Sequence, residues 1–220
     1  MKELLRYDIG DGVEAFSTRK DASLPFHVIQ PHQVHSDGIA VITDSTIDRD
    51  CLMGVDALVT NLVDCPIGVR TADCVPILVY DCVNRAVAAI HSGWRGTVKR
   101  IVQKVIREMN TQYGTCPQDI RTVIGPSIGP ESFVVHGDVI EAFIHSGFPI
   151  DKMARQNKED SYLVNLWEAN KYLLEEIGVK GDNIQLSGIC SYTHHDEFYS
   201  ARYEHDNKCR RTINVIKLKA

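Results

Sequence analysis

The sequence predicts an α+β fold, with mixed β-sheets flanked by helices in a single domain that covers residues 1–220. Three observations predict it. Short runs rich in Val and Ile cluster in the first half of the chain, no long amphipathic segment separates them, and no repeat or low-complexity linker divides the sequence. Strands that precede the helices in this way are typical of mixed sheets and not of a doubly wound sheet.

The expected strands are apolar runs bounded by Gly, Pro, Asn or Asp. They lie at 38–43, 56–60, 66–71, 75–81, 86–92, 120–125, 184–190 and 212–218. The clearest helix follows HSGWRG, with apolar residues at helical spacing, Thr97 as its expected cap and Gly114 at its end. Two further helices are expected over 138–146 and 166–177.

Composition narrows the class of protein. Lys and Arg number 24 against 29 Asp and Glu, which gives a net charge of −5. This balance argues against a nucleic-acid or anionic-membrane partner, because both need a basic face. No run approaches the ~18 apolar residues of a membrane span, and the first residues lack the apolar core of a signal peptide. Seven cysteines without CxxC spacing then indicate a reduced, cytoplasmic protein.

The segment CVPILVYDCVNRAVAAIH, residues 74–91, predicts a hairpin that turns at 81–84. In that register Cys74 lies directly opposite His91, with Cβ atoms ~5 Å apart, which suits two ligands of one metal ion. His35, before the run GIAVIT, is the preferred third ligand over His32. Two His and one Cys make a catalytic zinc set with the fourth position open, where the pKa of a bound water falls to ~7.

Two alternatives from the same residues stay open. Cys74 beside His91 would also form the nucleophile and base of a cysteine hydrolase. A structural zinc in an interaction domain is the other, although structural sites are usually closed by four ligands.

Several segments together resemble the laccase-domain family, first described as multicopper polyphenol oxidases and later as zinc-dependent purine nucleoside phosphorylases. The segments, in order, are QVHS (33–36), VRTADCVPIL (69–78), HSGWRGT (91–97), GPSIGPESF (125–133), NLWEANKYLL (165–174) and CSYTHHDEFYSARY (190–203). The resemblance implies phosphorolysis of adenosine, inosine, guanosine or methylthioadenosine with orthophosphate, and adenosine deaminase activity. It also implies zinc on His35, Cys74 and His91.

Copper chemistry of the laccase type is disfavoured, because several copper centres need many paired histidines. The chain has nine histidines and no HxH motif. Three departures from the family pattern concern substrate choice: Cys209-Arg210-Arg211 near the C-terminus, Phe133-Val134-Val135 after GPSIGP, and FSTRKDASLPF without a Gly pair.

Candidate catalytic residues are Asp73, for proton transfer or for orienting the base, and Arg95. Arg95 stands beside an expected helix start, where free N–H groups favour an anion. The candidate phosphate-binding residues are Arg95, Arg70 and Arg19, with Arg202 and Arg210 as weaker ones. The expected partners are therefore purine nucleosides and orthophosphate, and the sequence does not predict an oligomeric state.

Overall fold

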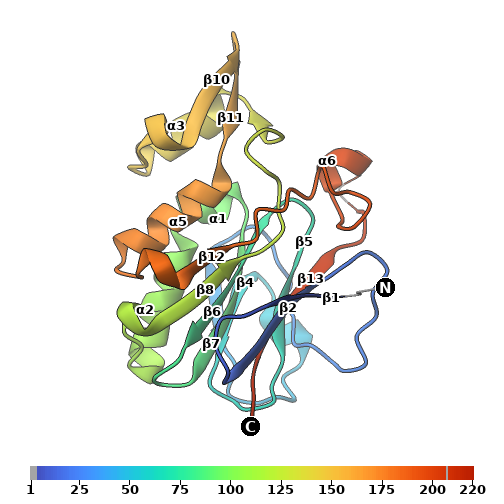
Figure 1. Ribbon diagram of the computed structural model, residues 1–220, viewed down its shortest axis with the longest axis vertical. Helices are drawn as coiled ribbons and strands as arrows, with labels where there is room; N and C mark the ends of the chain where they lie inside the picture. Colours follow the sequence, from blue (N-terminus) through green and yellow to red (C-terminus); the bar gives the residue numbers. More distant parts are fainter. Residues whose placement is uncertain (1–3, 207) are drawn as a thin grey trace.

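A computed structural model describes residues 4–206 and 208–220, and its strands form mixed sheets flanked by helices, as predicted (Figure 1). The central sheet has six strands in the order β12-β8-β6-β7-β4-β3. Only β3–β4 and β12–β8 pair in parallel within it. The six strands are β3 (Gly38–Val41), β4 (Val55–Thr60), β6 (Val75–Asp81), β7 (Ala86–Ser92), β8 (Ile120–Ile124) and β12 (Ile184–Leu186).

A second sheet of four antiparallel strands packs on one face of the central sheet, in the order β1-β2-β13-β5. These are β1 (Leu4–Tyr7), β2 (Val13–Thr18), β13 (Thr212–Leu218) and β5 (Ile67–Thr71). A small sheet, β10-β11-β9, stands apart at the top of Figure 1 and comprises β9 (Val134–Val135), β10 (Ala154–Lys158) and β11 (Ser161–Val164).

Helices cover the other face of the central sheet (Figure 1). They are α1 (Trp94–Val98), α2 (Ile101–Tyr113) and α5 (Leu166–Glu176). Helices α3 (Gly137–His145) and α4 (Ile150–Met153) lie beside the small sheet, and α6 (Ala201–Glu204) lies away from this helical layer. Three 3₁₀ turns complete the described elements: η1 (Arg49–Leu52), η2 (Pro117–Asp119) and η3 (Gly181–Asn183). Among the described residues, no helix combines the length and apolarity that a bilayer crossing requires.

The hairpin β6–β7 is the centre of the core, and every residue of its two strands is buried. Ile77 and Ile90 face α2 and α5, whereas Leu78 and Ala89 face the four-stranded sheet. Successive side chains of a strand point to opposite faces, so a strand covered on both faces needs a continuous apolar run. This explains why 75–81 and 86–92 were predicted with their observed bounds.

The predicted register of this hairpin is wrong by two positions. Pro76 pairs with His91 and Asp81 with Ala86, so Gly93, and not His91, lies across from Cys74. The turn spans residues 82–85, one residue later than expected, because Asp81 stays in the strand and its carboxylate accepts the N–H groups of Val83 and Asn84. A shift of two residues preserves the face of the sheet, so the two predicted ligands still meet.

The helix predicted after HSGWRG is broken into α1 and α2 by Arg100, whose backbone is left-handed (φ 59°). Thr97 is not the cap. Gly93 holds that position, and the Thr97 hydroxyl is buried and donates back to the Gly93 carbonyl at 3.0 Å. Gly114 ends α2 in the left-handed conformation, as predicted.

Three other departures from the predicted elements concern polar or short segments. The run 184–190 is a strand only to Leu186. The strands β1 and β2 and the small sheet were not predicted. Strand β10 reads ARQNK and is mostly exposed, so its sequence lacks an apolar pattern that would indicate a strand.

Candidate metal centre

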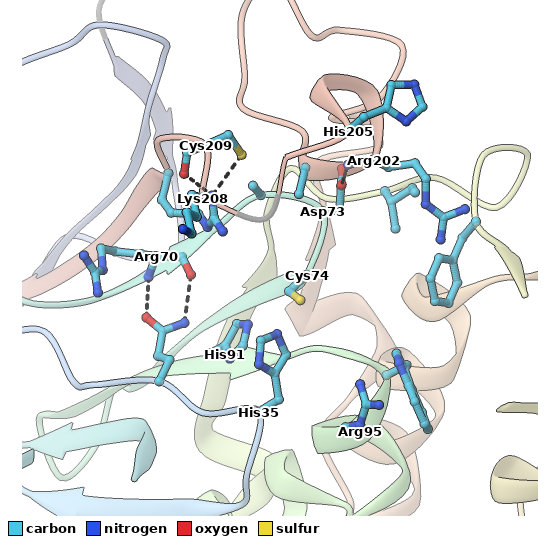
Figure 2. Close-up of a pocket in the computed structure, with 17 residues that line it drawn as sticks. His35, Arg70, Asp73, Cys74, His91, Arg95, Arg202, His205, Lys208 and Cys209 are labelled. Carbon is cyan, nitrogen blue, oxygen red and sulfur yellow. Dashed lines mark hydrogen bonds between the residues drawn. The ribbon is translucent and has the colours of Figure 1, made fainter. Parts of the chain in front are cut away.

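The structure brings His35, Cys74 and His91 together, although they come from three separate parts of the chain. Their candidate ligand atoms all lie within 4.8 Å of one another, and this is the one group of its kind among the described residues. The two imidazole rings are 4.9 Å apart, edge to face. Figure 2 shows the three side chains close together at the cavity wall, between Arg70 and Arg95.

Each ligand candidate stands at the end of an element. His91 is the penultimate residue of β7 and is buried, whereas Cys74 directly precedes β6 and is partly buried. His35 is exposed and lies in the loop before β3, with a left-handed backbone (φ 60°). His32 instead faces Asp50, with its Nε2 3.8 Å from the carboxylate, so the predicted preference for His35 is consistent with the geometry.

Asp56 contacts both histidines, and this role was not predicted from the sequence. It is fully buried in β4. Its carboxylate lies 2.7 Å from Nδ1 of His91 and accepts the N–H groups of Val34, His35 and Ser36 at 3.2, 3.0 and 2.7 Å, together with the Ser36 hydroxyl. An aspartate inside the otherwise apolar run VDALVT was the signal that could have identified it, because a buried carboxylate needs partners.

The hydrogen bond to Asp56 determines which nitrogen of His91 is available. An ionised carboxylate only accepts hydrogen bonds, so Nδ1 of His91 carries a hydrogen. Nε2 is then the nitrogen that a metal would bind, once it has lost its own hydrogen. Burial alone would raise the pKa of Asp56, but the hydrogen bonds from His91 and Ser36 outweigh it and lower that pKa to about 2. Asp56 is therefore ionised at neutral pH.

Cys74 and His91 act on each other electrostatically. Burial would raise the pKa of the Cys74 thiol, but the charge on His91 and hydrogen bonds from both histidines lower it below the ordinary value. For His91, burial alone would lower the pKa, whereas the Cys74 thiolate and Asp56 together raise it. The thiolate is the form of cysteine that binds a metal.

The donor set fits zinc. Ligands around a tetrahedral zinc, about 2.0 Å away for nitrogen and 2.3 Å for sulfur, lie roughly 3.3 to 3.8 Å from one another. A present separation of at most 4.8 Å requires side-chain adjustment and no change of fold. Three protein ligands leave the fourth position to the cavity, as in catalytic zinc sites.

A cavity of about 960 Å³ opens on the three ligand candidates and is strongly basic. Its cationic side chains are Arg70, Arg95, Arg202, Lys208 and Arg211, against the single carboxylate of Asp73. This contrasts with the net charge of −5 for the whole chain. The cavity therefore suits an anionic ligand.

Arg95 and Arg70 lie on opposite sides of the three ligand candidates (Figure 2). Arg95 is exposed at the start of α1, and its guanidinium lies 4.3 Å from the centre of the Trp94 ring. Arg202 lies over Phe133 at 5.7 Å and donates to the Val134 carbonyl.

Asp73 does not have the open carboxylate expected of a proton donor. One oxygen accepts the Ser191 hydroxyl and the other accepts the N–H of Arg202, both at 2.7 Å. Its backbone is left-handed (φ 82°). Asp73 thus ties the segment that carries Arg202 to the loop that carries Cys74, and the sequence did not indicate this connection.

Arg19 is not among the residues that line the cavity. Its guanidinium forms an ion pair with Glu197 and lies over the Phe198 ring. Arg210 pairs with Asp21 at an exposed position. Two basic residues that the sequence analysis did not select, Lys208 and Arg211, line the cavity instead.

Residues 11–219 match the family model described as multi-copper polyphenol oxidoreductase laccase. The chain belongs to this family. The laccase-family assignment agrees with the resemblance found in the sequence, and it extends over almost the whole chain.

Relatives within the laccase family carry enzyme names. The chain is 39% identical over 188 residues to a protein from Bacteroides thetaiotaomicron named purine nucleoside phosphorylase, covering 82% of this chain and 70% of that protein. It is 41% identical over 182 residues to adenosine deaminase RL5 from an unknown prokaryotic organism, covering 80% and 69%. The chain is therefore similar to enzymes of both names.

A solved structure confirms the fold. The Bacillus licheniformis hypothetical protein YfiH superposes with a TM-score of 0.91 at 27% identity, over 100% of this chain and 97% of that one. The mixed sheets and flanking helices are thus shared with the YfiH structure.

Proposed function

We propose that this protein is a zinc-dependent purine nucleoside phosphorylase that acts on adenosine, inosine, guanosine or methylthioadenosine. The observation that carries the proposal is the His35–Cys74–His91 group at the wall of a basic cavity. The name of the Bacteroides thetaiotaomicron relative supports the reaction class. A cavity of about 960 Å³ is large enough for a nucleoside together with orthophosphate.

His35, Cys74 and His91 would hold the zinc, and Asp56 would orient His91 and the His35 loop toward it. A bound zinc supplies a Lewis acid and lowers the pKa of a coordinated water. The identity of the metal is part of the proposal and follows from the ligand types, because imidazole and thiolate together favour zinc over magnesium or calcium.

In phosphorolysis, an orthophosphate oxygen forms a bond to C1′ of the sugar while the bond from C1′ to the purine nitrogen breaks. The electron pair of that bond leaves with the purine, which takes up a proton, and the transition state resembles an oxocarbenium ion. Arg95 is our candidate to hold the orthophosphate, because it is exposed at the cavity wall and free to turn toward an anion.

Asp73 is assigned a positioning role in this reaction. Both of its oxygens are already engaged as acceptors. This favours a role in holding α6, which carries Arg202, over the two roles expected from the sequence, proton transfer and orientation of the base. Arg202, fixed through its own N–H, is then presented to the cavity. Arg19 has no role in the proposal, because it lies outside the lining and pairs with Glu197.

Adenosine deaminase activity is a second part of the proposal and is supported by the name of the relative RL5. That reaction adds water to C6 of adenine and releases ammonia, so it needs no orthophosphate. The two activities are therefore separable by their products and by phosphate dependence.

A cysteine hydrolase is the alternative with a specific observation in its favour. The Cys74 thiol has a lowered pKa beside a His91 whose pKa is raised, which is the electrostatic state of a nucleophile and base pair. A nucleophile and base pair needs only Cys74 and His91, so it does not explain why His35 lies beside them. Treatment with a chelator distinguishes a cysteine hydrolase from a zinc enzyme, because the hydrolase keeps its activity without metal. The Cys74 thiol of a hydrolase also reacts faster with an alkylating reagent than a Cys74 that is bound to zinc.

A multicopper oxidase is poorly supported. Chemistry of that kind needs several copper centres, whereas the described residues offer one group with ligand spacing. All seven cysteines are free thiols in the structure. Since free thiols are typical of reducing compartments, we place the enzyme in the cytoplasm as part of the proposal.

The test combines metal analysis with product analysis. Purified protein is assayed for zinc per chain, then incubated with adenosine or inosine, with and without orthophosphate. The proposal predicts about one zinc per chain and a free base that forms only with phosphate. Base release without phosphate, or full activity after chelation, would contradict it.

A further inference from the structure

Arg70 has an unusual environment for an arginine at a cavity wall. Its Nε is buried and has no hydrogen-bond partner, and the guanidinium forms no ion pair with any described carboxylate. The residue is nevertheless held firmly, because the side chain of Gln33 bonds both its backbone N–H and its carbonyl at 2.8 Å (Figure 2). The chain therefore fixes this arginine in place without giving it a counter-ion.

The charges near Arg70 are of its own sign. Burial lowers the pKa of the Arg70 guanidinium, and the positive charges of Arg49 and Arg211 lower it further. Lys208 lines the same part of the cavity (Figure 2). Like charges that are partly buried repel one another, and this repulsion is energetically unfavourable. A bound anion would offset it, because it attracts each of the cationic side chains.

This basic cluster is separate from Arg95. In Figure 2 the labels of Arg70 and Lys208 lie on one side of the three ligand candidates, and Arg95 lies on the other. Phosphorolysis needs a single anion beside C1′, and Arg95 is the candidate for it. A neutral nucleoside carries no negative charge that could bind to the second cationic region, on the other side of the ligand group.

We propose that Arg70, with Arg49, Lys208 and Arg211, forms a second anion site that binds a phosphoryl group belonging to the purine substrate itself. This inference rests on the proposed function and extends its substrate class from neutral nucleosides to nucleoside 5′-phosphates. The 5′ carbon is the part of the nucleoside from which a phosphoryl group extends away from the base. Its negative charge would pair with the unpartnered guanidinium.

The test compares binding of adenosine 5′-monophosphate and adenosine to the zinc-loaded protein by calorimetry, at constant ionic strength. We expect the monophosphate to bind at least about tenfold more tightly. In Arg70→Gln that preference should vanish while the affinity for adenosine stays unchanged. Arg49→Gln, at an exposed position, should reduce the preference without risk to folding. Arg155→Gln is the matched control, because Arg155 on β10 pairs with Glu131 and is not among the residues that line the cavity.

Equal affinity for the two ligands in the wild type, or an unchanged preference in Arg70→Gln, would overturn the inference. So would a loss of orthophosphate affinity in Arg70→Gln measured with adenosine present, since the cluster would then hold orthophosphate. Because binding is measured without turnover, the preference can hold even if no base is released. That result would contradict the proposed function and leave the anion site standing.

Discussion

The carboxylate of Asp56 lies 2.7 Å from Nδ1 of His91, and the same carboxylate accepts the N–H of His35. One buried side chain thus holds both imidazoles, one through its ring and the other through its backbone. The ligand group is consequently arranged by the protein before any metal binds.

The first prediction concerns zinc affinity. Asp56→Asn presents an amide NH₂ group to donors and no longer fixes the tautomer of His91, so the affinity for zinc should fall about 10- to 100-fold. Competition with a chromophoric chelator measures the change. Asp37→Asn is the control, since Asp37 pairs with Lys99 and Lys104 at the surface and should leave zinc affinity unchanged. Equal affinities in wild type and Asp56→Asn would contradict this role.

The second prediction concerns acid stability of the zinc-free protein. The pKa of Asp56 is about 2 in the folded state against an ordinary value of 3.8, so its contribution is fully present above pH 4. It is lost as the pH falls from about 4 to 2, and it amounts to roughly 2 kcal/mol. Urea unfolding at pH 7, 4 and 3 should show wild type and Asp56→Asn converging. A stability difference that stays constant over this range would refute the assignment.

The third prediction uses Gly93, which lies across from Cys74. A Cβ added there would come 2.9 Å from the Cys74 sulfur and 3.3 Å from Cδ2 of His35. Its backbone (φ −64°) is open to any residue, so Gly93→Ala should act on the ligand group and not through backbone strain. We expect at least about a tenfold loss of zinc affinity. Gly137→Ala, where an added Cβ meets nothing within 4 Å, is the control.

The fourth prediction concerns the segment 201–211. Asparagine tolerates the left-handed backbone of Asp73, but in Asp73→Asn one acceptor becomes an NH₂ group that faces a donor. The amide of Arg202 should therefore exchange its hydrogen about tenfold faster, and KM should rise while the zinc content stays the same. Asp196→Asn, an exposed residue in the preceding loop, is the control. Unchanged exchange at Arg202 would show that Asp73 does not hold this segment.

Much of the fold was predictable because its central hairpin is buried on both faces. Residues 75–81 and 86–92 carry continuous apolar runs, and their bounds follow directly from that pattern. The polar strand β10 and the break at Arg100 were not predictable, since neither leaves a periodic apolar signal. The predicted hairpin register was wrong for a related reason: the side-chain hydrogen bonds of Asp81 place the turn at 82–85 and not at 81–84, and such local bonds leave no periodic apolar signal.

The candidate site was predictable where its residue types are chemically distinctive. His35, Cys74 and His91 were selected from the sequence and are brought together by the fold. Asp56 and the connection from Asp73 to Arg202 were missed because both depend on contacts between distant segments. Arg19 was selected for its charge alone, and its partner Glu197 was not foreseen.

The most direct measurement is the stoichiometry and affinity of zinc in the wild type and in His35→Ala, Cys74→Ala and His91→Ala, followed by phosphate-dependent base release from adenosine. We expect one tightly bound zinc per wild-type chain and loss of both zinc and activity in all three variants. A variant that lacks zinc and still releases base, or a wild type that binds no zinc, would contradict it.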